Sequence, residues 1–438
     1  MSALGLYRAF TVLGAPAIVG YLGLRRLHGK EDRARFSERL GKASLPRRPG
    51  PLVWIHGASV GEAQSALVLV ARILSHEAEA TALVTTGTVS SARLLAERLP
   101  ERAIHQYVPA DHPAWVGRFL DHWQPDVGLW IESELWPNLV VETAERNIPM
   151  VLVNARMSAR SFANWRLAPG AIRQLLACFR RVLAQSEADG ERYAKLGARE
   201  VAVTGSLKYD ADPLPADSGE LKRLAAEIGD RPRWLAASTH PGEERTIAAA
   251  HRLLKLRHPG LLTILVPRHA GRGDELAAAL RGNGLAVARR SNGEPAVRDT
   301  DVYLADTMGE LGLLYRLTEV VFVGGSLVRH GGQNMLEPAR FGCALLYGPH
   351  VHNFRAIAAD LIAVGAAEVV RDERELADAV SALLADETAR AKRGAAAKHA
   401  TEAGRGVLDD VIAALGPELE ILARTPNSDR DGIGRARA

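Results

Sequence analysis

Apolar and polar positions alternate in blocks along most of the chain, and the blocks switch between strand-like and helix-like periods. Short runs that are almost wholly apolar, such as residues 127–132 and 149–154, are typical of strands buried on both faces of a parallel sheet. Longer segments with apolar residues every three or four positions, such as 61–76 and 135–146, are typical of amphipathic helices. This strand–helix order predicts an α/β fold with helices on both faces of parallel sheets.

The alternation is interrupted at residues 210–219, where the sequence DADPLPADSG is rich in proline, aspartate and glycine. Such a segment is typical of a linker between domains. We therefore predict two Rossmann-like, doubly wound domains that face a cleft. The expected parts are an N-terminal membrane segment at 1–30, a first domain at 31–210, a linker at 211–219, a second domain at 220–424 and a disordered tail at 425–438.

The N-terminus is the most apolar part of the chain. Residues 9–24 are almost purely apolar, and with residues 3–7 they reach the roughly 20 residues that cross a bilayer. A basic cluster follows, as the positive-inside tendency predicts for a cytoplasmic flank. It consists of Arg25, Arg26, His28, Lys30, Arg33, Arg35, Arg39, Lys42, Arg47 and Arg48. We predict a membrane-associated helix, spanning or interfacial, with the remaining chain in the cytoplasm; a buried core helix is the alternative.

Composition narrows the class of protein further. Apolar residues make up 47% and charged residues 24%, which is the balance of a folded globular protein. A net charge of +4 over 438 residues is too small to indicate a nucleic-acid-binding protein. Only Cys178 and Cys343 are present, so a disulfide framework is not expected. No Cys/His zinc-ligand spacing occurs in the sequence, and we predict no metal.

Polar residues that could carry chemistry follow the predicted strands of the first half. In HGASVGE, residues 56–62, Glu62 falls at the start of a helix, where it could act as a general base or only complement the helix dipole. Glu132 and Glu134 follow a very apolar strand; one of them could face the cleft while Ser133 or Glu134 caps the next helix. Lys208 could reach a phosphate between the domains, although a lone lysine there is usually solvated. The spacing leaves each of these alternatives open.

The second half contains candidates for binding a phosphorylated ligand. Residues 238–243, STHPGE, open a helix, where small hydroxylated side chains suit either a phosphate or a simple cap. Arg268 follows a long apolar strand and could form a bidentate pair with phosphate. Residues 306–310 join another strand to a helix. The glycine-rich stretch 324–338 contains Glu337, whose carboxylate could accept hydrogen bonds from ribose hydroxyls, and it lacks the ending of a Walker loop.

As a set, these segments resemble the bacterial 3-deoxy-D-manno-octulosonic acid (Kdo) transferases that are specific for lipid A. The resemblance runs from about residue 31 to residue 410, and its motifs follow the family's order. They are SVGE, ESELWPN, VNARMSARS, LAQSE, TGSLKYD, AASTHPGEE, LVPRH, DTMGEL, VGGSL and HGGQNMLEP. The resemblance implies the GT-B fold, which consists of two Rossmann-like domains, and a location at the cytoplasmic face of the inner membrane.

The resemblance also implies roles for individual residues. Glu62 matches the family's general base, and Glu132 and Lys208 match residues proposed to stabilise the transition state. The CMP-binding positions match Pro267, Arg268, Met308, Gly309, Glu310, Asn334, Met335, Leu336 and Glu337. The chain departs from the usual family pattern at residues 57–58 and 333–335, and neither departure removes a carboxylate or cation with an assigned role.

The expected reaction follows from the same resemblance. The family moves Kdo from CMP-Kdo to the 6′-hydroxyl of a tetraacylated lipid A precursor, lipid IVA, in lipopolysaccharide biosynthesis. We predict an inverting glycosyltransferase of this kind, with CMP-Kdo as donor substrate and no cofactor. The basic cluster would then bind the phosphates of the acceptor. Two alternatives remain: another GT-B enzyme that uses a UDP-sugar, and a catalytically inactive, membrane-tethered nucleotide-binding module.

Overall fold

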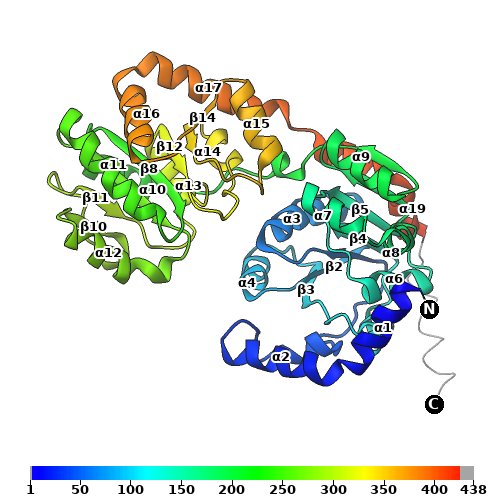
Figure 1. The fold of residues 1–438 in the computed structure, drawn as a ribbon. Helices are drawn as coiled ribbons and strands as arrows, with labels where there is room; N and C mark the ends of the chain where they lie inside the picture. Colours follow the sequence, from blue (N-terminus) through cyan, green and yellow to red (C-terminus); the bar gives the residue numbers. More distant parts are fainter. Residues whose placement is uncertain (1, 425–438) are drawn as a thin grey trace. The chain divides into compact units, whose positions relative to one another are not determined.

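The computed structural model describes residues 2–424, which form two compact units, each built on its own sheet (Figure 1). The described part of the first unit is residues 2–211 and 406–424, and the second unit is residues 212–405. The tail predicted at 425–438 lies outside the described residues. Each sheet has seven strands, all parallel, with helices on both faces. The prediction of an α/β fold with two doubly wound sheets is confirmed.

The first unit contains strands β1 to β7. They are β1 (Leu52–His56), β2 (Thr81–Thr86), β3 (Ala103–Tyr107), β4 (Val127–Ile131), β5 (Met150–Ala155), β6 (Arg181–Ala184) and β7 (Val201–Val203). Its helices are α1 (Ala3–Leu13), α2 (Ala15–Leu27), α3 (Val60–His76), α4 (Val89–Arg98), α5 (Pro113–Trp123), α6 (Pro137–Glu145), α7 (Ala159–Trp165), α8 (Pro169–Leu176), α9 (Glu187–Leu196), α18 (Val407–Ala414) and α19 (Gly416–Arg424), with 3-10 turns η1 (Phe36–Leu40) and η2 (Leu207–Asp210).

The strand order of the first sheet is β3-β2-β1-β4-β5-β6-β7. Successive residues of a strand point to opposite faces. Accordingly Val53 and Ile55 of β1 belong to the core under α3 and α4, whereas Leu52 and Trp54 belong to the core under α5, α6 and α8. Because both faces are buried, the strands read as continuous apolar runs in the sequence.

The second unit repeats this architecture. Its strands are β8 (Arg233–Thr239), β9 (Leu262–Pro267), β10 (Val287–Arg289), β11 (Val302–Leu304), β12 (Val320–Val323), β13 (Ala344–Tyr347) and β14 (Ala367–Val369), in the order β10-β11-β9-β8-β12-β13-β14. Its helices are α10 (Ser218–Ile228), α11 (Glu243–Arg257), α12 (Gly273–Gly282), α13 (Leu311–Leu317), α14 (Leu336–Arg340), α15 (Arg355–Ala363), α16 (Glu373–Ala385) and α17 (Glu387–Ala403), with 3-10 turns η3 (Ala270–Arg272) and η4 (Arg290–Asn292).

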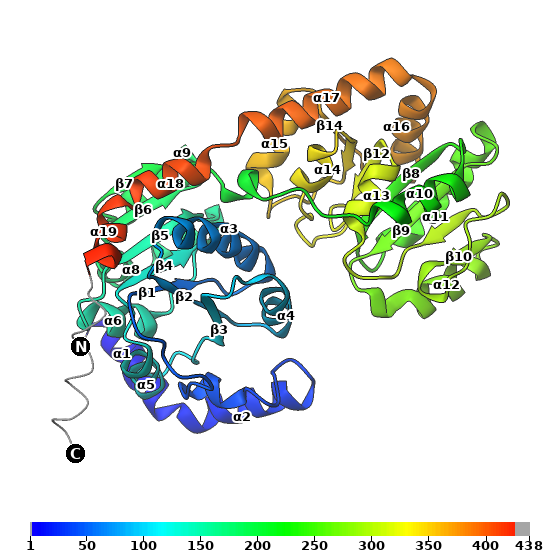
Figure 2. The same cartoon turned by 180° about the vertical axis from the view of Figure 1, so that it is seen from behind.

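The C-terminal end of the chain returns to the first unit. Residues 406–424 contain α18 and α19, which lie along the first sheet (Figure 2). Val411 of α18 and Leu419 of α19 belong to the same buried cluster as Val53 of β1. The predicted second domain, 220–424, is therefore wrong at its C-terminal end. The predicted linker, 211–219, also extends two residues too far, because residues 218 and 219 already belong to α10.

The N-terminal segment forms two helices instead of the one predicted within residues 1–30. α1 and α2 meet at Gly14 and are bent by 65°. One continuous helix would have to run through Pro16, which has no N–H to donate and crowds the preceding turn. Within residues 2–424, no single helix is long and apolar enough to cross a membrane, and only this bent pair, taken together, is so by length and composition.

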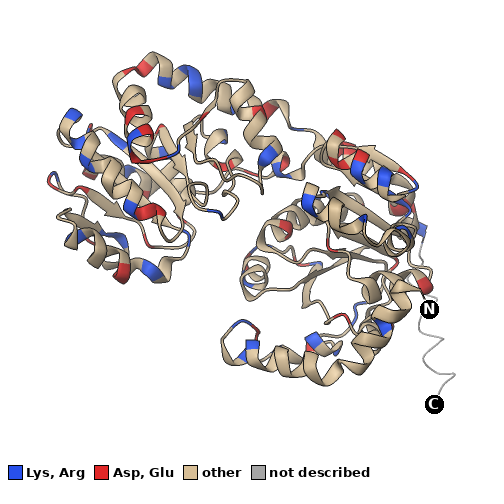
Figure 3. Ribbon diagram, viewed as in Figure 1, with Lys and Arg blue, Asp and Glu red and all other residues tan. Residues whose placement is uncertain are grey.

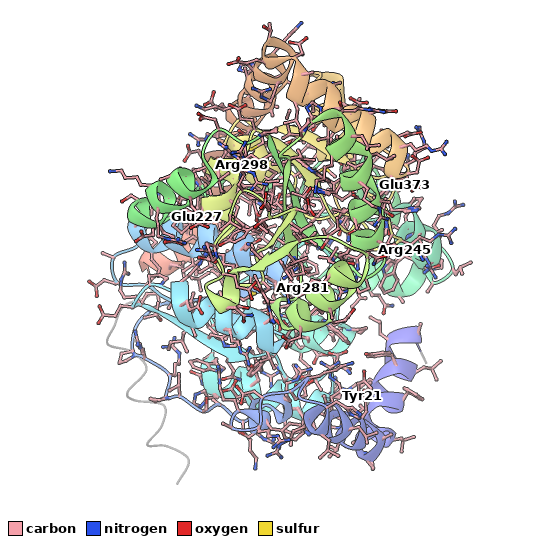
Figure 4. The ribbon with its side chains drawn as sticks, turned by 90° about the vertical axis from the view of Figure 1, so that its left-hand side faces the viewer. Tyr21, Glu227, Arg245, Arg281, Arg298 and Glu373 are labelled. Atoms are coloured by element: carbon pink, nitrogen blue, oxygen red, sulfur yellow. The ribbon has the colours of Figure 1, made fainter. Side chains whose placement is uncertain are left out.

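The helix pair is docked along one side and exposed on the other. Tyr7 donates to Asp111 at 2.9 Å, and Arg8 pairs with Glu142 at 2.5 Å. Figure 3 shows few charged residues along the two helices, and Figure 4 labels Tyr21 on them. Of their residues only Thr11 and Leu22 are buried, so the alternative of a buried core helix is wrong. The exposed apolar side chains are Leu6, Phe10, Val12, Leu13, Val19, Tyr21, Leu24 and Leu27.

Part of the basic cluster forms ion pairs inside the first unit, which corrects the expectation that the whole cluster can bind the phosphates of the acceptor. Arg25 and Arg39 both pair with the buried Glu31, at 2.6 and 3.3 Å. Arg35 pairs with the buried Glu38 at 2.9 Å. Reversing these charges would leave buried carboxylates without their partners, which destabilises a fold. The exposed basic side chains of the cluster are Arg26, His28, Lys30, Arg33, Lys42 and Arg48.

Candidate active site

The chain reverses its direction of travel across the first sheet between β1 and β4. After β3 at one edge, the strand order resumes on the other side of β1 with β4. Ligands of open α/β sheets bind at such switch points, beyond the carboxyl ends of the strands. Glu62 lies in the first turn of α3, directly after β1, and Glu132 directly follows β4. The topology therefore brings these two predicted residues to one edge of the sheet.

The local hydrogen bonds fix the Glu62 carboxylate at the start of α3. Ser59 is the N-cap residue, and its hydroxyl donates to Glu62 Oε1 at 2.7 Å. The Ala58 N–H donates to Glu62 Oε2 at 2.6 Å. A side chain at Gly57 would place its Cβ 2.9 Å from the Glu62 Cβ, so the small residue there leaves room for the carboxylate. Glu62 thus lies in the first turn of the helix, where it complements the helix dipole as one alternative proposed, and it also lies at the switch point.

The surroundings of Glu62 favour its protonated form. Burial, followed by the negative charges of Glu132 and Glu134, raises the pKa of Glu62 from 4.5 to about 7. The bonds from Ser59 and Ala58 oppose this shift but do not cancel it. A carboxylate with a pKa near neutrality is well matched to proton transfer at physiological pH. Glu62 can therefore accept a proton from a hydroxyl and release it again.

Glu132 and Lys208 form an ion pair at the same edge. Lys208 Nζ donates to Glu132 Oε1 at 2.9 Å, and both side chains are largely buried. Glu132 has a φ of +63°, a strained conformation for a residue with a side chain, and such strain is often found at functional sites. The buried Asn154 accepts from the N–H of Leu207 at 3.1 Å, which fixes the turn that carries Lys208. The structure therefore groups Glu62, Glu132 and Lys208.

Glu134 does not cap α6, contrary to one of the alternatives. Its carboxylate accepts from Trp136 Nε1 at 2.8 Å. The first turn of α6 is capped instead by Asp111, which accepts from the N–H groups of Asn138 and Leu139 at 3.1 and 2.8 Å. The negative charge of Glu134 raises the pKa of Glu62. Burial, together with the charge of Glu132, raises the pKa of Glu134 itself.

In the second unit, the predicted nucleotide-binding segments follow neighbouring strands. The order β11-β9-β8-β12 brings the carboxyl ends of these strands together. Arg268 follows Pro267 at the end of β9, residues 308–310 follow β11, and residues 334–337 lie in the connection after β12. The switch point of this sheet lies between β8 and β12. The segments therefore share one edge, where a ligand of a doubly wound domain is expected.

The side chains of these segments differ in what they can offer a ligand. Arg268 makes no hydrogen bond or ion pair with its guanidinium among the described residues, and Met308 is exposed. Glu310 is paired with Arg290 and accepts from Thr307, and the bond from Arg290 lowers the pKa of Glu310. A carboxylate engaged in this way holds its own loop, so the segment around Gly309 would offer a ligand chiefly backbone groups.

The side chains of residues 334–337 differ in how much of their surface is exposed to a ligand. Asn334 Nδ2 donates to Glu337 Oε1 at 3.2 Å, and both side chains are partly exposed. Met335 and Leu336 have no exposed surface at all, because they pack into the core below the loop. That these two residues bind the nucleotide stays a prediction.

Two residues of the second unit, Arg290 and Glu243, hold loops near this edge, a role that was not predicted for them. Arg290 joins Glu310 to Glu220 of α10, and the Arg-Arg pair at 289–290 was its only sequence signal. Glu243 was interpreted as part of a helix start, whereas its carboxylate lies against the loop after β12. A contact across more than 80 residues leaves no local trace in a single sequence.

Within residues 2–424, no group of three or more His, Cys, Asp or Glu side chains is arranged to hold a metal ion.

Comparison with known proteins finds relatives that cover most of the chain. The family profile of 3-deoxy-D-manno-octulosonic-acid transferase (kdotransferase) matches residues 34–211. The 3-deoxy-D-manno-octulosonic acid transferase of Haemophilus influenzae is 36% identical and covers 94% of this chain and 98% of its own length. That of Bordetella pertussis is 38% identical over 86% of this chain and 90% of its own.

The fold is shared more widely than the sequence. The crystal structure of a glycosyltransferase from Rickettsia africae is 12% identical, covers 86% of this chain and 99% of that chain, and has a TM-score of 0.58. At this identity the likeness concerns the two-domain GT-B fold alone. The similarity to the Haemophilus and Bordetella enzymes, in contrast, extends through both units at more than 30% identity. The chain therefore belongs to the family of Kdo transferases, which are glycosyltransferases.

Proposed function

We propose that the protein transfers Kdo from CMP-Kdo to the 6′-hydroxyl of a tetraacylated lipid A precursor, with inversion at the anomeric carbon. The observation that carries this proposal is Glu62, a buried carboxylate at the switch point whose pKa is raised to about 7. It stands in a chain that is similar to Kdo transferases over nearly its whole length. The same observation counts against an inactive module, which would need no carboxylate poised in this way.

The proposed reaction needs one base and stabilisation of the leaving group. Glu62 takes the proton of the acceptor hydroxyl as its oxygen attacks the anomeric carbon of Kdo. The bond between that carbon and the phosphate oxygen breaks, and CMP departs with the bonding electrons. Arg268 is a cation suited to stabilising the departing phosphate, and the resemblance gives Lys208 a role in stabilising the transition state; preorganised charge is usually the largest catalytic contribution. Direct attack on the face opposite CMP inverts the configuration.

The identity of the nucleotide is tested by binding. Titration calorimetry with CMP and UDP on the full-length protein is expected to show CMP binding at least about tenfold more tightly, a difference of about 1.4 kcal/mol. Arg268→Ala should weaken CMP binding, whereas Arg245→Ala on the surface of α11, labelled in Figure 4, should not. Preference for UDP would favour the alternative of a UDP-sugar donor.

We further propose that α1 and α2 rest on the cytoplasmic face of the inner membrane. Their exposed apolar side chains would enter the acyl region, which stabilises binding by about 1.5–3 kcal/mol for a fully buried leucine. Leu13→Glu should therefore weaken co-sedimentation with anionic phospholipid vesicles by about tenfold or more. Leu256 of α11 is equally exposed, at 83%, and provides the matched control Leu256→Glu. Equal loss in both variants would contradict a membrane role for this helix pair.

A groove in the first unit supports an acylated acceptor. It has a volume of about 450 Å³ and is lined mainly by Leu4, Leu135, Trp136, Trp165 and Ala171. Two polar groups line it as well, and both have partners: the Tyr7 hydroxyl donates to Asp111, and Glu134 accepts from Trp136. The groove therefore offers a hydrocarbon surface. Because Glu134 lines the groove and also acts on Glu62 by its charge, an acyl chain here would lie close to Glu62.

Filling this groove with a larger side chain tests whether it binds an acyl chain of the acceptor. Ala171→Trp should raise the acceptor KM, most strongly for acceptors with long acyl chains, because the indole would occupy the space of the chain. CMP affinity should stay unchanged. The matched control is Gln174→Trp, which puts the same side chain on the exposed face of α8. If both folded variants keep the wild-type dependence on chain length, the groove does not bind an acyl chain.

A further inference from the structure

Glu243 is an unusual carboxylate of the second unit. It is the first residue of α11, directly after the turn that follows β8, and it has no exposed surface. Its Oε1 accepts from the N–H groups of Ser326 and Leu327 at 3.0 and 2.9 Å. Its Oε2 accepts from the N–H groups of Gly325 and His240 at 2.7 and 2.9 Å. Among the described residues it forms no ion pair, so backbone donors alone compensate its burial.

Three of these four bonds connect the two sides of the switch point, and the fourth, from His240, stays within the turn after β8. Consecutive backbone N–H groups that converge on an anion form a nest, and here residues 325–327 are such a nest. The loop can approach β8 this closely because it begins with two glycines. A Cβ on Gly324 would lie 2.6 Å from the Ser238 carbonyl oxygen, and Gly325 has a φ of +68°. The nest is therefore filled by the protein's own carboxylate and is closed to a donor phosphate.

The loop held by Glu243 leads directly to the predicted nucleotide contacts. The Gly332 N–H donates to the Gly325 carbonyl at 2.7 Å, and the Gln333 N–H donates to the Gly324 carbonyl at 3.1 Å. The Gln333 side chain also bonds to His240 at 2.9 Å. Asn334 follows at once. The position of residues 334–337 is thus set by a loop whose far end is fixed on Glu243.

We propose that Glu243 is a positioning residue for donor binding: its carboxylate holds the loop of residues 324–333 in the conformation that presents Asn334 and Glu337 to the nucleotide. This inference rests on the proposed binding of CMP-Kdo by the second unit. It gives Glu243 no contact with the reacting atoms. A positioning residue of this kind affects the affinity for the donor while leaving the affinity for the acceptor unchanged.

Two substitutions in the full-length protein test the proposal. Glu243→Gln has one acceptor oxygen and an NH₂ group, so it loses about two of the four hydrogen bonds. Its NH₂ group would also point at backbone N–H groups, which are donors themselves. Glu243→Asp keeps the carboxylate on a shorter side chain. The CMP Kd and the donor KM should rise roughly tenfold or more in the glutamine variant and less in the aspartate variant. The acceptor KM should stay that of the wild type.

The control is Glu387→Gln, which removes an exposed carboxylate from the first position of α17 in the same unit. It should change neither KM. Wild-type CMP affinity in a folded Glu243→Gln protein would overturn the proposal, and so would an equal rise in donor and acceptor KM.

Hydrogen exchange tests the loop contact first in the wild type, without any variant, and then in Glu243→Asp. In the wild type, the N–H groups of residues 325–327 should exchange slowly although they lie outside any helix or strand, and Glu243→Asp should speed their exchange. Rapid exchange in the wild type would overturn the loop contact itself. A wild-type protein that binds no CMP would contradict the proposed function, and the donor role of Glu243 would fail with it even if residues 325–327 are protected.

Discussion

Replacing Glu62 by glutamine is expected to lower kcat by about 10²–10⁴-fold, the usual contribution of a general base. Glutamine has almost the same shape, and its amide oxygen can still accept from the Ala58 N–H, so the start of α3 should remain intact. It cannot take a proton from the acceptor hydroxyl. CMP affinity should not change, because Glu62 belongs to the first unit and the predicted nucleotide contacts belong to the second.

The control for this experiment is Glu187→Gln, an exposed first-turn glutamate of α9 in the same unit. Its kcat should equal that of the wild type. A Glu62→Gln enzyme with wild-type turnover would remove the general base from the mechanism.

The same carboxylate should govern the pH dependence of the reaction. A general base must be ionised, so kcat/KM for the acceptor should rise with pH and level off above the pKa of Glu62, about 7. The rise should be absent from the residual activity of Glu62→Gln. A wild-type profile that is flat between pH 5 and 8 would mean that Glu62 does not titrate during the reaction.

Glu62 should also cost the protein stability at neutral pH. Below pH 4.5 the folded and unfolded chains both keep this proton, and there is no effect. Between 4.5 and about 7 only the unfolded chain releases it, so stability falls as pH rises. The loss reaches at most about 3 kcal/mol above pH 7. Glu62→Gln should therefore unfold at a higher temperature than the wild type at pH 8 and at a similar temperature at pH 4.

Removing the Lys208 ammonium is the second change with a large expected effect. Lys208→Met should lower kcat by about 10²–10³-fold, the loss typical of one preorganised electrostatic contact in an active site. It should also destabilise the protein, by on the order of 2 kcal/mol, because the largely buried Glu132 loses an ion-pair partner. The unbalanced charge of Glu132 should raise the pKa of Glu62 further and move the pH profile to higher pH.

A double-mutant cycle separates these effects. Adding Glu132→Gln to Lys208→Met removes the unpaired carboxylate, so stability should recover and the pH profile should move back to lower pH. Turnover should not recover, because the cation is still missing. The control is Lys195→Met, which breaks an exposed ion pair with Glu191 on α9 and should have little effect on either quantity. Full recovery of turnover in the double variant would show that Lys208 acts only through Glu132.

The sequence contained enough to predict the sheets and the edges where chemistry could lie. Buried parallel strands such as β4 are apolar at every position, which makes them visible without any structure. Residues that directly follow such strands, including Glu132 and Arg268, must lie at the carboxyl edge of a sheet. That rule located the candidate residues, while their individual roles came from the resemblance to Kdo transferases.

The remaining features depend on contacts between distant residues. The N–H groups at the start of α6 are capped by Asp111, which comes from another segment. The apolar face of α18 packs into the core of the first unit beside α3, and the sequence of α18 does not indicate which unit that face contacts. Arg35 and Arg39 look like free cations in the sequence, yet each faces a buried carboxylate. The bend at Gly14 was predictable in principle from Pro16, but the apolar composition of the segment favoured one helix.

The most direct test of the account is transfer of labelled Kdo from CMP-Kdo, generated in the assay, to the tetraacylated lipid A precursor. Products would be identified by mass and the new linkage examined by NMR. The account predicts a product heavier by Kdo, linked at the 6′-hydroxyl with inverted configuration, formed by the wild type and almost absent with Glu62→Gln. No transfer by the wild type, or a product of retained configuration, would contradict it.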